Sequence, residues 1–136
     1  MKVLIDTNVV LDVLINNAVF FAHSKKIFDL AEQKRITGFI SASAITDIFY
    51  IAQRKLGKKA VKEAIKKVLK VFSPATVTDS HIYQALDLEW DDFEDSVQYI
   101  VGEDLSIDYI VTRNTQDFVP GSIPAVTPEQ FIKFIT

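Results

Sequence analysis

Short apolar runs rich in β-branched residues alternate along this chain with longer segments that have helical periodicity. Consecutive parallel strands need crossover connections, usually helices, and those helices cover both faces of the sheet. The alternation therefore predicts an α/β fold with a central, mostly parallel sheet. The expected strands lie at residues 3–5, 38–42, 75–78, 109–112 and 125–127.

The segments between the expected strands carry signals for the start of a helix. The expected helices cover residues 9–15, 24–36, 43–56, 58–72, 79–88 and 93–105, and Pro128 opens a last one. Polar side chains that accept from free backbone N–H groups are the preferred N-caps. The expected caps are Thr7 or Asn8 for the first helix, Ser41 or Ser43 for the third and Asp79 for the fifth.

The composition describes a globular protein without a targeting or membrane signal. Its 136 residues suit one domain, spanning residues 1–136, and 49% of them are hydrophobic. The chain has no cysteine, which excludes disulfides and thiolate metal ligands. The N-terminal apolar run already contains Asp6, unlike a signal peptide, and no apolar stretch approaches the roughly 20 residues that span a bilayer. We therefore expect a cytoplasmic protein that does not enter a membrane.

Charge is distributed unevenly along the chain. The net charge is −3, which by itself gives no case for a nucleic-acid partner. Residues 54–70 hold eight of the 15 basic residues, whereas residues 87–104 hold eight of the 18 acidic residues and no basic one. A chain polarised in this way can place an acidic pocket beside a basic face.

Four aspartates stand out by their surroundings rather than by their type. They are Asp6 directly after the first strand, Asp47 among apolar residues of the third helix, Asp95 in the helix before the fourth strand, and Asp117 in the loop after that strand. Functional groups of parallel sheets gather beyond the carboxyl ends of the strands. An acid in apolar surroundings is costly unless it is paired, hydrogen-bonded or bound to a metal. Arg113 is the only Lys or Arg within fifteen residues of either late acid, so a divalent cation is the expected counter-charge.

The available ligand atoms predict a hard cation. Carboxylate oxygens without Cys suit Mg²⁺ or Mn²⁺, and the two histidines, His23 and His81, lie outside the acidic segments. Three or four carboxylates around such ions suit the hydrolysis of a phosphodiester. The metal activates a water molecule and offsets the charge that grows on the phosphate oxygens.

Each aspartate also has a plainer interpretation. Asp6 could cap the following helix, and Asp47 could be a solvated helix residue. Asp95 could be one of several surface acids on an acidic helix, and Asp117 could be a turn residue. The four positions together, in this order along the chain, favour the metal site over four unrelated roles.

Four pieces of the chain carry a family resemblance. They are "VLIDTNVVLDVL" near the start, "SASAITDIFYIAQR" in the middle, and "DFEDSVQYIV" and "DYIVTRNTQDF" late in the chain. The pieces keep their order and spacing over nearly the whole chain. In these residues the sequence resembles the PIN-domain family, in particular the VapC-type toxin ribonucleases.

The resemblance implies roles for individual residues. The metal-binding carboxylates would be Asp6, Asp47, Asp95 and Asp117. Thr7 and Asn8 would orient the first acid, and Thr112 or Asn114 would bond the site or the substrate. The implied fold is a three-layer α/β/α sandwich, and the implied reaction is Mg²⁺- or Mn²⁺-dependent endonucleolytic cleavage of RNA. Members of the family often form homodimers, and the toxin members are inhibited by a cognate antitoxin.

Further charged residues are weaker candidates. Asp92 is expected to be an accessory or surface acid, and replacement of Asp12 is expected to show only a surface effect. Lys58 and Lys59, in the basic segment, could bind RNA phosphates, although a charge run of this kind is more often a solvated helix face. Arg113 is a further candidate for RNA binding.

One position departs from the family pattern. The second acid is usually Glu, whereas this chain has Asp47, whose side chain reaches up to roughly 1.5 Å less far. Because Mg²⁺–oxygen distances of about 2.0–2.1 Å tolerate little error, the helix sits closer, a water bridges the gap, or activity is weaker. The last outcome leaves open a PIN-like module that binds RNA or a protein without cutting.

A third class of function is an aspartyl-phosphate enzyme, because an Asp at a strand end also suits a phosphotransfer nucleophile. The haloacid-dehalogenase-like form of that site has a second Asp two residues later, where this chain has Asn8. It also has a Lys before the late acids, and this chain has none there. We rank this interpretation last.

Overall fold

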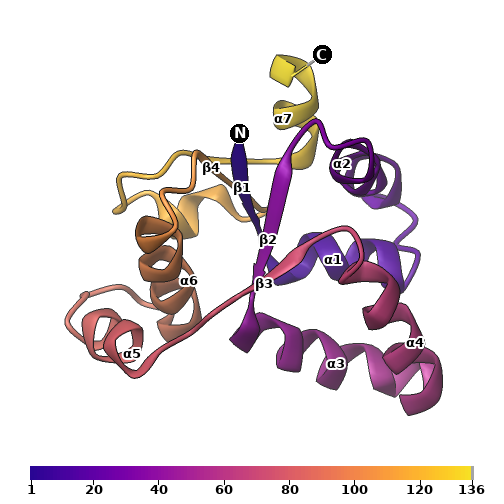
Figure 1. Cartoon of the computed structure of the whole chain (residues 1–136), viewed down its shortest axis with the longest axis horizontal. Helices are drawn as coiled ribbons and strands as arrows, with labels where there is room; N and C mark the ends of the chain where they lie inside the picture. The colour runs from indigo at the N-terminus through magenta and orange to yellow at the C-terminus, as the bar shows by residue number, and fades with distance from the viewer. Residues whose placement is uncertain (136) are drawn as a thin grey trace.

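A parallel sheet forms the middle of the molecule (Figure 1). The computed structural model describes residues 1–135, and Thr136, the last residue of the predicted domain, lies outside that range. Within the described residues five strands pair in the order β3-β2-β1-β4-β5, and every pair is parallel. The strands are β1 (Lys2–Ile5), β2 (Thr37–Ser41), β3 (Ser73–Ala75), β4 (Tyr109–Val111) and β5 (Ala125–Val126). The predicted parallel α/β fold is confirmed.

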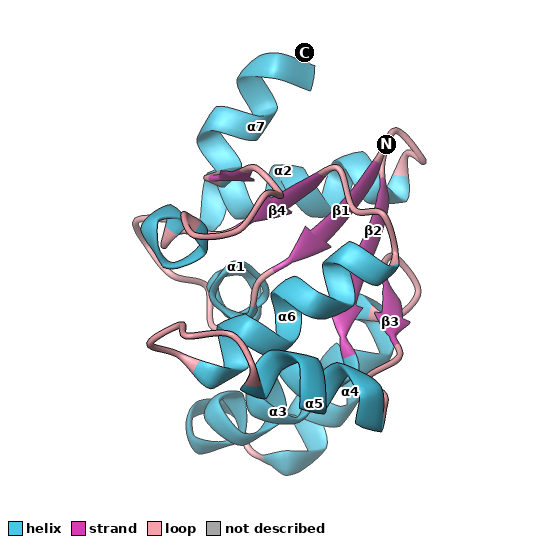
Figure 2. Cartoon of the chain, turned by 90° about the vertical axis from the view of Figure 1, so that its left-hand side faces the viewer, coloured by secondary structure: helices cyan, strands magenta, loops and turns pink. Residues whose placement is uncertain are grey.

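Helices cover both faces of the sheet and complete a three-layer α/β/α sandwich. Those packed on one face are α1 (Thr7–Leu14), α2 (Phe21–Glu32), α3 (Ala42–Leu56), α4 (Lys58–Val68) and α7 (Pro128–Ile135). On the other face lie α5 (Asp79–Leu86) and α6 (Phe93–Asp104), which stand in front of the sheet in Figure 2. A short 3₁₀ helix, η1 (Thr115–Phe118), follows β4.

The central strand β1 is apolar and buried from Val3 to Ile5. Val3 and Ile5 pack into the core on the side of α1 and α2, whereas Leu4 packs into the core on the side of α6. All three side chains are fully buried. A strand covered on both faces needs apolar residues at every position, because its side chains alternate between two cores.

Two helix caps differ from the prediction. The cap of α1 is Asp6, whose side chain accepts from the Thr7 backbone N–H, rather than Thr7 or Asn8. The cap of α5 is Thr78 rather than Asp79, because Thr78 and His81 form a reciprocal capping box. Ser41, one of the two expected caps of α3, does cap that helix.

The third strand also lies earlier than predicted, at Ser73–Ala75 instead of residues 75–78. Its pairing with β2 places Ser73 beside Phe39 and Ala75 beside Ser41, so the ladder ends where β2 ends. The chain then leaves the sheet to reach the cap at Thr78. Pro74 is tolerated because β3 is an edge strand.

The carboxyl ends of β1 and β4 meet at one rim of the sheet. The ladder between them extends one residue beyond β1, because the backbone N–H of Asp6 donates to the carbonyl oxygen of Val111 at 3.0 Å. Asp6 and Thr112 therefore leave the sheet side by side. None of the helices within residues 1–135 is long and apolar enough to cross a membrane.

Candidate metal centre

An open pocket of about 580 Å³ lies at this rim of the sheet. It is lined by residues from four parts of the chain: the β1–α1 junction, α3, the start of α6 and the loop after β4. The lining residues are Asp6, Thr7, Asn8, Leu11, Asp47, Tyr50, Ile51, Asp92, Glu94, Asp95, Asn114 and Asp117. The fold thus brings the four aspartates singled out in the sequence into one pocket.

Asp6 is the most constrained acid of the pocket, with 6% of its surface exposed. One carboxylate oxygen accepts from the Thr7 backbone N–H at 2.8 Å and from the Gln98 side-chain amide at 2.9 Å. The other accepts from the Thr112 hydroxyl at 2.6 Å and from the Asn8 amide at 3.2 Å. All four donors are neutral, so they hold the carboxylate in place without cancelling its charge.

Thr112, Asn8 and Asn114 connect the end of β4 to Asp6. Besides donating to Asp6, the Thr112 hydroxyl accepts from the backbone N–H of Asn114 at 3.0 Å and from the Asn8 amide at 3.4 Å. The Asn8 amide oxygen accepts from the backbone N–H of Arg113 at 3.2 Å. These bonds tie the start of the loop that carries Asp117 to Asp6, and the supporting roles of the three residues stay a prediction.

Glu94 is a pocket residue that the sequence reasoning missed. It lies on the first turn of α6, where it accepts from the Thr7 hydroxyl at 3.3 Å and shares a hydrogen bond with Asp47. Burial, then that hydrogen bond and the charge of Asp47, raise the pKa of Glu94 from 4.5 to about 7, although the Thr7 bond opposes the shift. Its signal in the sequence was its place directly before Asp95.

Asp95 has a similar electrostatic environment. Burial raises the pKa of Asp95 from 3.8 to about 7, and the charges of Asp6, Asp92 and Asp117 add to the effect. Asp92 has a second role as the N-cap of α6, because its side chain accepts from the Asp95 backbone N–H at 2.9 Å. Asp92 is therefore a structural cap of α6, and its part as an accessory acid stays a prediction.

Gln98 is a second residue that the sequence did not reveal. It is fully buried on α6, one turn beyond Glu94 and Asp95, and its amide nitrogen donates to Asp6. Its amide oxygen finds no partner within residues 1–135. Nothing in its type marks a buried glutamine as part of an acidic site, so only the packing of α6 against β1 could identify it.

The donor chemistry of the pocket fits a hard divalent cation. Six carboxylates line it and no Lys or Arg does. Burial first, and then the neighbouring negative charges, raise the pKa values of two of them, Glu94 and Asp95. Oxygen ligands of this kind suit Mg²⁺ or Mn²⁺. In the part of the chain that the structure describes, however, no group of three or more His, Cys, Asp or Glu side chains is already arranged to hold an ion. The pocket therefore fits the ion by charge and atom type, and its side chains have to draw together to bind it.

Asp12 corrects an expectation from the sequence. It is 1% exposed rather than on the surface, and one of its oxygens accepts from Arg113 Nε at 2.9 Å and from the Ser24 hydroxyl at 3.1 Å. The Arg113 guanidinium also lies over the Phe20 ring, 4.2 Å from its centroid. The expectation failed because α1 buries the side of the helix that carries Asp12 against α2.

The remaining candidates, Lys58 and Lys59, lie exposed at the start of α4 and outside the pocket. They are separated from Asp47 by the rest of α3, a length of roughly 14 Å from Asp47 to Leu56. Any contact that they make with a substrate held in the pocket has to involve a more distant part of that substrate.

The chain was compared with known sequences and solved structures. No curated protein sequence matches the chain. Among solved structures, it is similar to the Mycobacterium tuberculosis toxin VapC20, described as cleaving the sarcin-ricin loop, with a TM-score of 0.70 and 17% identity over 88% of this chain and 95% of that one.

Two further similar structures are toxin–antitoxin assemblies. VapBC2 of Rickettsia felis, bound to a DNA fragment from its promoter, has a TM-score of 0.72 at 13% identity, over 93% of this chain and 98% of that chain. A Klebsiella pneumoniae toxin–antitoxin complex has a TM-score of 0.69 at 20% identity, over 93% of this chain and 97% of that chain. At these identities the likeness concerns the fold. A family model described as the PIN domain matches residues 2–116, and the chain therefore belongs to the PIN-domain family.

Proposed function

We propose that this protein is a metal-dependent endoribonuclease and the toxin of a toxin–antitoxin pair. The observation that carries the proposal is the pocket in which Asp6, Asp47, Asp95 and Asp117 converge without a cation among the lining residues. Membership of the PIN-domain family supports nuclease chemistry, because PIN-domain nucleases generally use divalent metals. The similar VapC20 structure, a toxin described as cleaving an RNA loop, supports the choice of RNA.

In this proposal the four aspartates hold Mg²⁺ or Mn²⁺. The bound ion supplies an activated water and offsets charge on the phosphate that is attacked. Thr7, Asn8 and Thr112 keep Asp6 in a single orientation through the bonds described above. Asn114 positions the loop of Asp117, whose backbone N–H donates to the Asn114 carbonyl at 3.1 Å. Arg113, and more distantly Lys58 and Lys59, contact the phosphates of the RNA.

Glu94 bears on the one departure from the family pattern, the shorter Asp47. Glu94 extends from α6 to the Asp47 carboxylate, so the pocket holds a longer acid beside the shorter one. We propose that Glu94 helps to complete the ligand set beside Asp47 when the ion binds.

The proposal extends to the context of the protein. Residues 1–136 act as one PIN domain in the cytoplasm, where RNA is available. A cognate antitoxin restrains the activity, and the active form is a homodimer. The similar toxin–antitoxin complexes support the antitoxin, and co-purification with the product of a neighbouring gene would identify it.

The decisive experiment measures cleavage of a labelled RNA with Mg²⁺, with Mn²⁺ and with EDTA, together with Mn²⁺ binding by calorimetry. Asp6→Asn and Asp95→Asn should lower cleavage by more than the about 10- to 100-fold that loss of a group supporting a metal ligand costs. They should also weaken Mn²⁺ binding. Asp87→Asn is a matched control, because Asp87 is an exposed acid outside the pocket. The assignment fails if both pocket variants cleave as fast as this control.

A second candidate function is a PIN-like module that binds RNA or a protein without cutting it. Two observations favour it: Asp47 stands where the family usually has Glu, and no three acidic side chains are already arranged around an ion within residues 1–135. Calorimetry separates the two functions, since a module without affinity for Mn²⁺ or Mg²⁺ could not carry out metal-dependent cleavage.

A further inference from the structure

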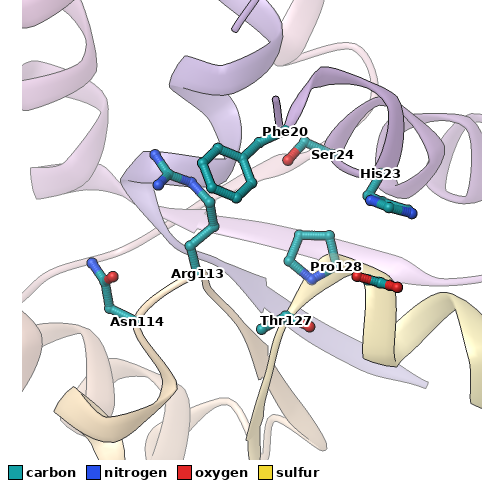
Figure 3. Close-up of a pocket in the computed structure, with 8 residues that line it drawn as sticks. Phe20, His23, Ser24, Arg113, Asn114, Thr127 and Pro128 are labelled. Atoms are coloured by element: carbon teal, nitrogen blue, oxygen red, sulfur yellow. The ribbon is translucent and has the colours of Figure 1, made fainter. Parts of the chain in front are cut away.

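A second cavity, of about 290 Å³, opens beside the acidic pocket (Figure 3). Three segments line it: the start of α2, the loop after β4 and the start of α7. The lining residues are Phe20, His23, Ser24, Arg113, Asn114, Thr127, Pro128 and Glu129. Asn114 lines both this cavity and the acidic pocket, so the two lie next to each other. The volume of this second cavity is near the lower end of the range for small-ligand sites.

Arg113 gives this cavity the positive charge that the acidic pocket lacks. It is the only Lys or Arg that lines either of the two pockets. The bond to the buried Asp12 uses Nε, and within residues 1–135 the two terminal nitrogens make no hydrogen bond. Asp12 therefore fixes the direction of the guanidinium and leaves its outer edge available to an acceptor such as a phosphate oxygen.

Phe20 provides an aromatic surface in the same cavity. Phe20 is 38% exposed, so part of this large apolar side chain remains accessible to a ligand. In Figure 3 the ring stands between the Arg113 guanidinium and the side chains of Ser24 and His23. The turn before α2 holds it there, because the Phe20 backbone N–H donates to the Asn17 side chain at 3.1 Å.

The remaining charge determines how a ligand can lie. Glu129 also lines the cavity, and its carboxylate repels a phosphate. The phosphate is therefore directed to Arg113, beside the acidic pocket. The side chains of Phe20, His23 and Pro128, which also line the cavity, offer ring surfaces and polar edges that suit an unstacked base.

We propose that this cavity is a nucleotide subsite, in which Arg113 binds a phosphate and Phe20 stacks a base of single-stranded RNA next to the bond that is cut. The inference rests on the proposed function, because it takes RNA as the ligand. It adds a site that accepts one flipped-out nucleotide, and it explains why a cation anchored by a buried acid stands at the edge of an acidic pocket.

The test measures binding of a short, labelled single-stranded RNA of randomised sequence by fluorescence anisotropy in EDTA. Phe20→Ala should weaken binding about tenfold, within the range that base–aromatic stacking supports, whereas Phe20→Trp should retain it. Val19→Ala is the matched control, because Val19 is a neighbouring exposed apolar residue outside the cavity. Equal affinity for the parent, Phe20→Ala and Val19→Ala would overturn the subsite, as would a parent that does not bind the RNA at all.

The phosphate contact has its own measurement. The paired variant Asp12→Asn with Arg113→Gln removes both charges, so it leaves no buried charge unpaired and keeps the net charge. The slope of log affinity against log salt concentration should become shallower by about 0.7, the value for one phosphate contact on a single strand. An unchanged slope in a folded paired variant would exclude Arg113 from phosphate binding.

Cleavage by the same proteins in Mn²⁺ separates this inference from the proposed function. If the parent cleaves RNA and Phe20→Ala binds and cleaves like the parent, the endoribonuclease stands and the subsite fails. If the parent binds RNA through Phe20 but never cleaves it, the subsite stands and the endoribonuclease fails.

Discussion

The two ends of helix α1 each carry a buried aspartate, and the two are satisfied in opposite ways. Asp6, at the first turn, accepts only from neutral donors and faces further carboxylates across the pocket. Asp12, on the next turn, accepts from the Arg113 guanidinium and the Ser24 hydroxyl. Their exposed fractions are almost the same, 6% and 1%.

The difference between these two acids shows that burial alone does not identify a metal ligand. Asp12 has its counter-charge within the fold, so it closes an ion pair between α1 and the loop after β4. The neutral donors fix the orientation of Asp6 but do not neutralise its charge, so the carboxylate can attract a cation from solution. The charge of the partners, rather than the depth of the acid, separates a structural role from the role proposed for Asp6.

Replacing each acid by Asn should show the difference between Asp6 and Asp12 most clearly in the free energy of unfolding. Asp12→Asn leaves the Arg113 charge without its partner, and loss of one member of a buried pair costs about 3–5 kcal/mol. Because Arg113 is 29% exposed, we expect the lower end of that range. Asp6→Asn should lower the free energy of unfolding far less, because it relieves repulsion among the carboxylates. Urea unfolding in EDTA measures both, and equal losses for the two variants would remove the distinction.

Thr112→Val should sharpen the role of the neutral donors around Asp6. Thr112 is fully buried and its hydroxyl donates to Asp6 at 2.6 Å, so valine keeps the shape and removes the bond. We expect Mn²⁺ affinity to fall about 10- to 100-fold, as when a group that orients a metal ligand is lost. Calorimetry measures the affinity, with Thr76→Val, at an exposed position, as the control. An unchanged affinity would mean that Asp6 does not depend on this donor.

The pH dependence of stability should test the uncompensated charge of the pocket. The pKa values of Glu94 and Asp95 are raised from 4.5 and 3.8 to about 7, so the folded protein keeps protons that the unfolded chain has already released. The metal-free protein should therefore lose stability as the pH rises from about 4 to about 7. Saturating Mn²⁺ should restore stability at neutral pH, because the ion binds only the folded state.

The thermal midpoint in EDTA across this pH range measures the effect, and Glu94→Gln supplies the control. The variant removes one of the two titrating groups, so its midpoint should change less with pH than that of the parent. Parallel curves for the two proteins would show that Glu94 does not titrate in the pocket.

Neutralising the basic start of α4 should have the smallest effect. Lys58→Gln with Lys59→Gln removes two exposed charges that lie outside both pockets. RNA affinity at low salt should fall less than it does for Phe20→Ala, and the difference should disappear at high salt, where exposed charges are screened. A loss greater than that of Phe20→Ala would move the main RNA contact from the cavity to α4.

The sequence contained enough to predict the sheet, because a strand covered on both faces must be apolar at every buried position, as β1 is from Val3 to Ile5. It also placed the four aspartates at one rim, since the order of strands and helices determines where their carboxyl ends point. Local details were less predictable. Thr78 and Asp79 are both good caps, and the choice between them depends on the reach of His81.

Residues that act across the fold were out of reach of the sequence. Glu94 and Gln98 join the pocket only because α6 packs against the end of β1, and neither residue type points to that contact. Asp12 looked like a surface acid because its partner, Arg113, is 101 residues away in the chain. Phe20 joins Arg113 only because the loop after β4 places the guanidinium over its ring.

The sequence by itself determined the layered α/β architecture and the meeting of the four aspartates, because hydrophobic periodicity and strand order are properties read along the chain. Only the tertiary structure decided which acid is neutralised and which keeps its charge. Electrostatic pairing depends on distances in space, and those distances are determined when α2, α6 and the loop after β4 pack around the two ends of α1.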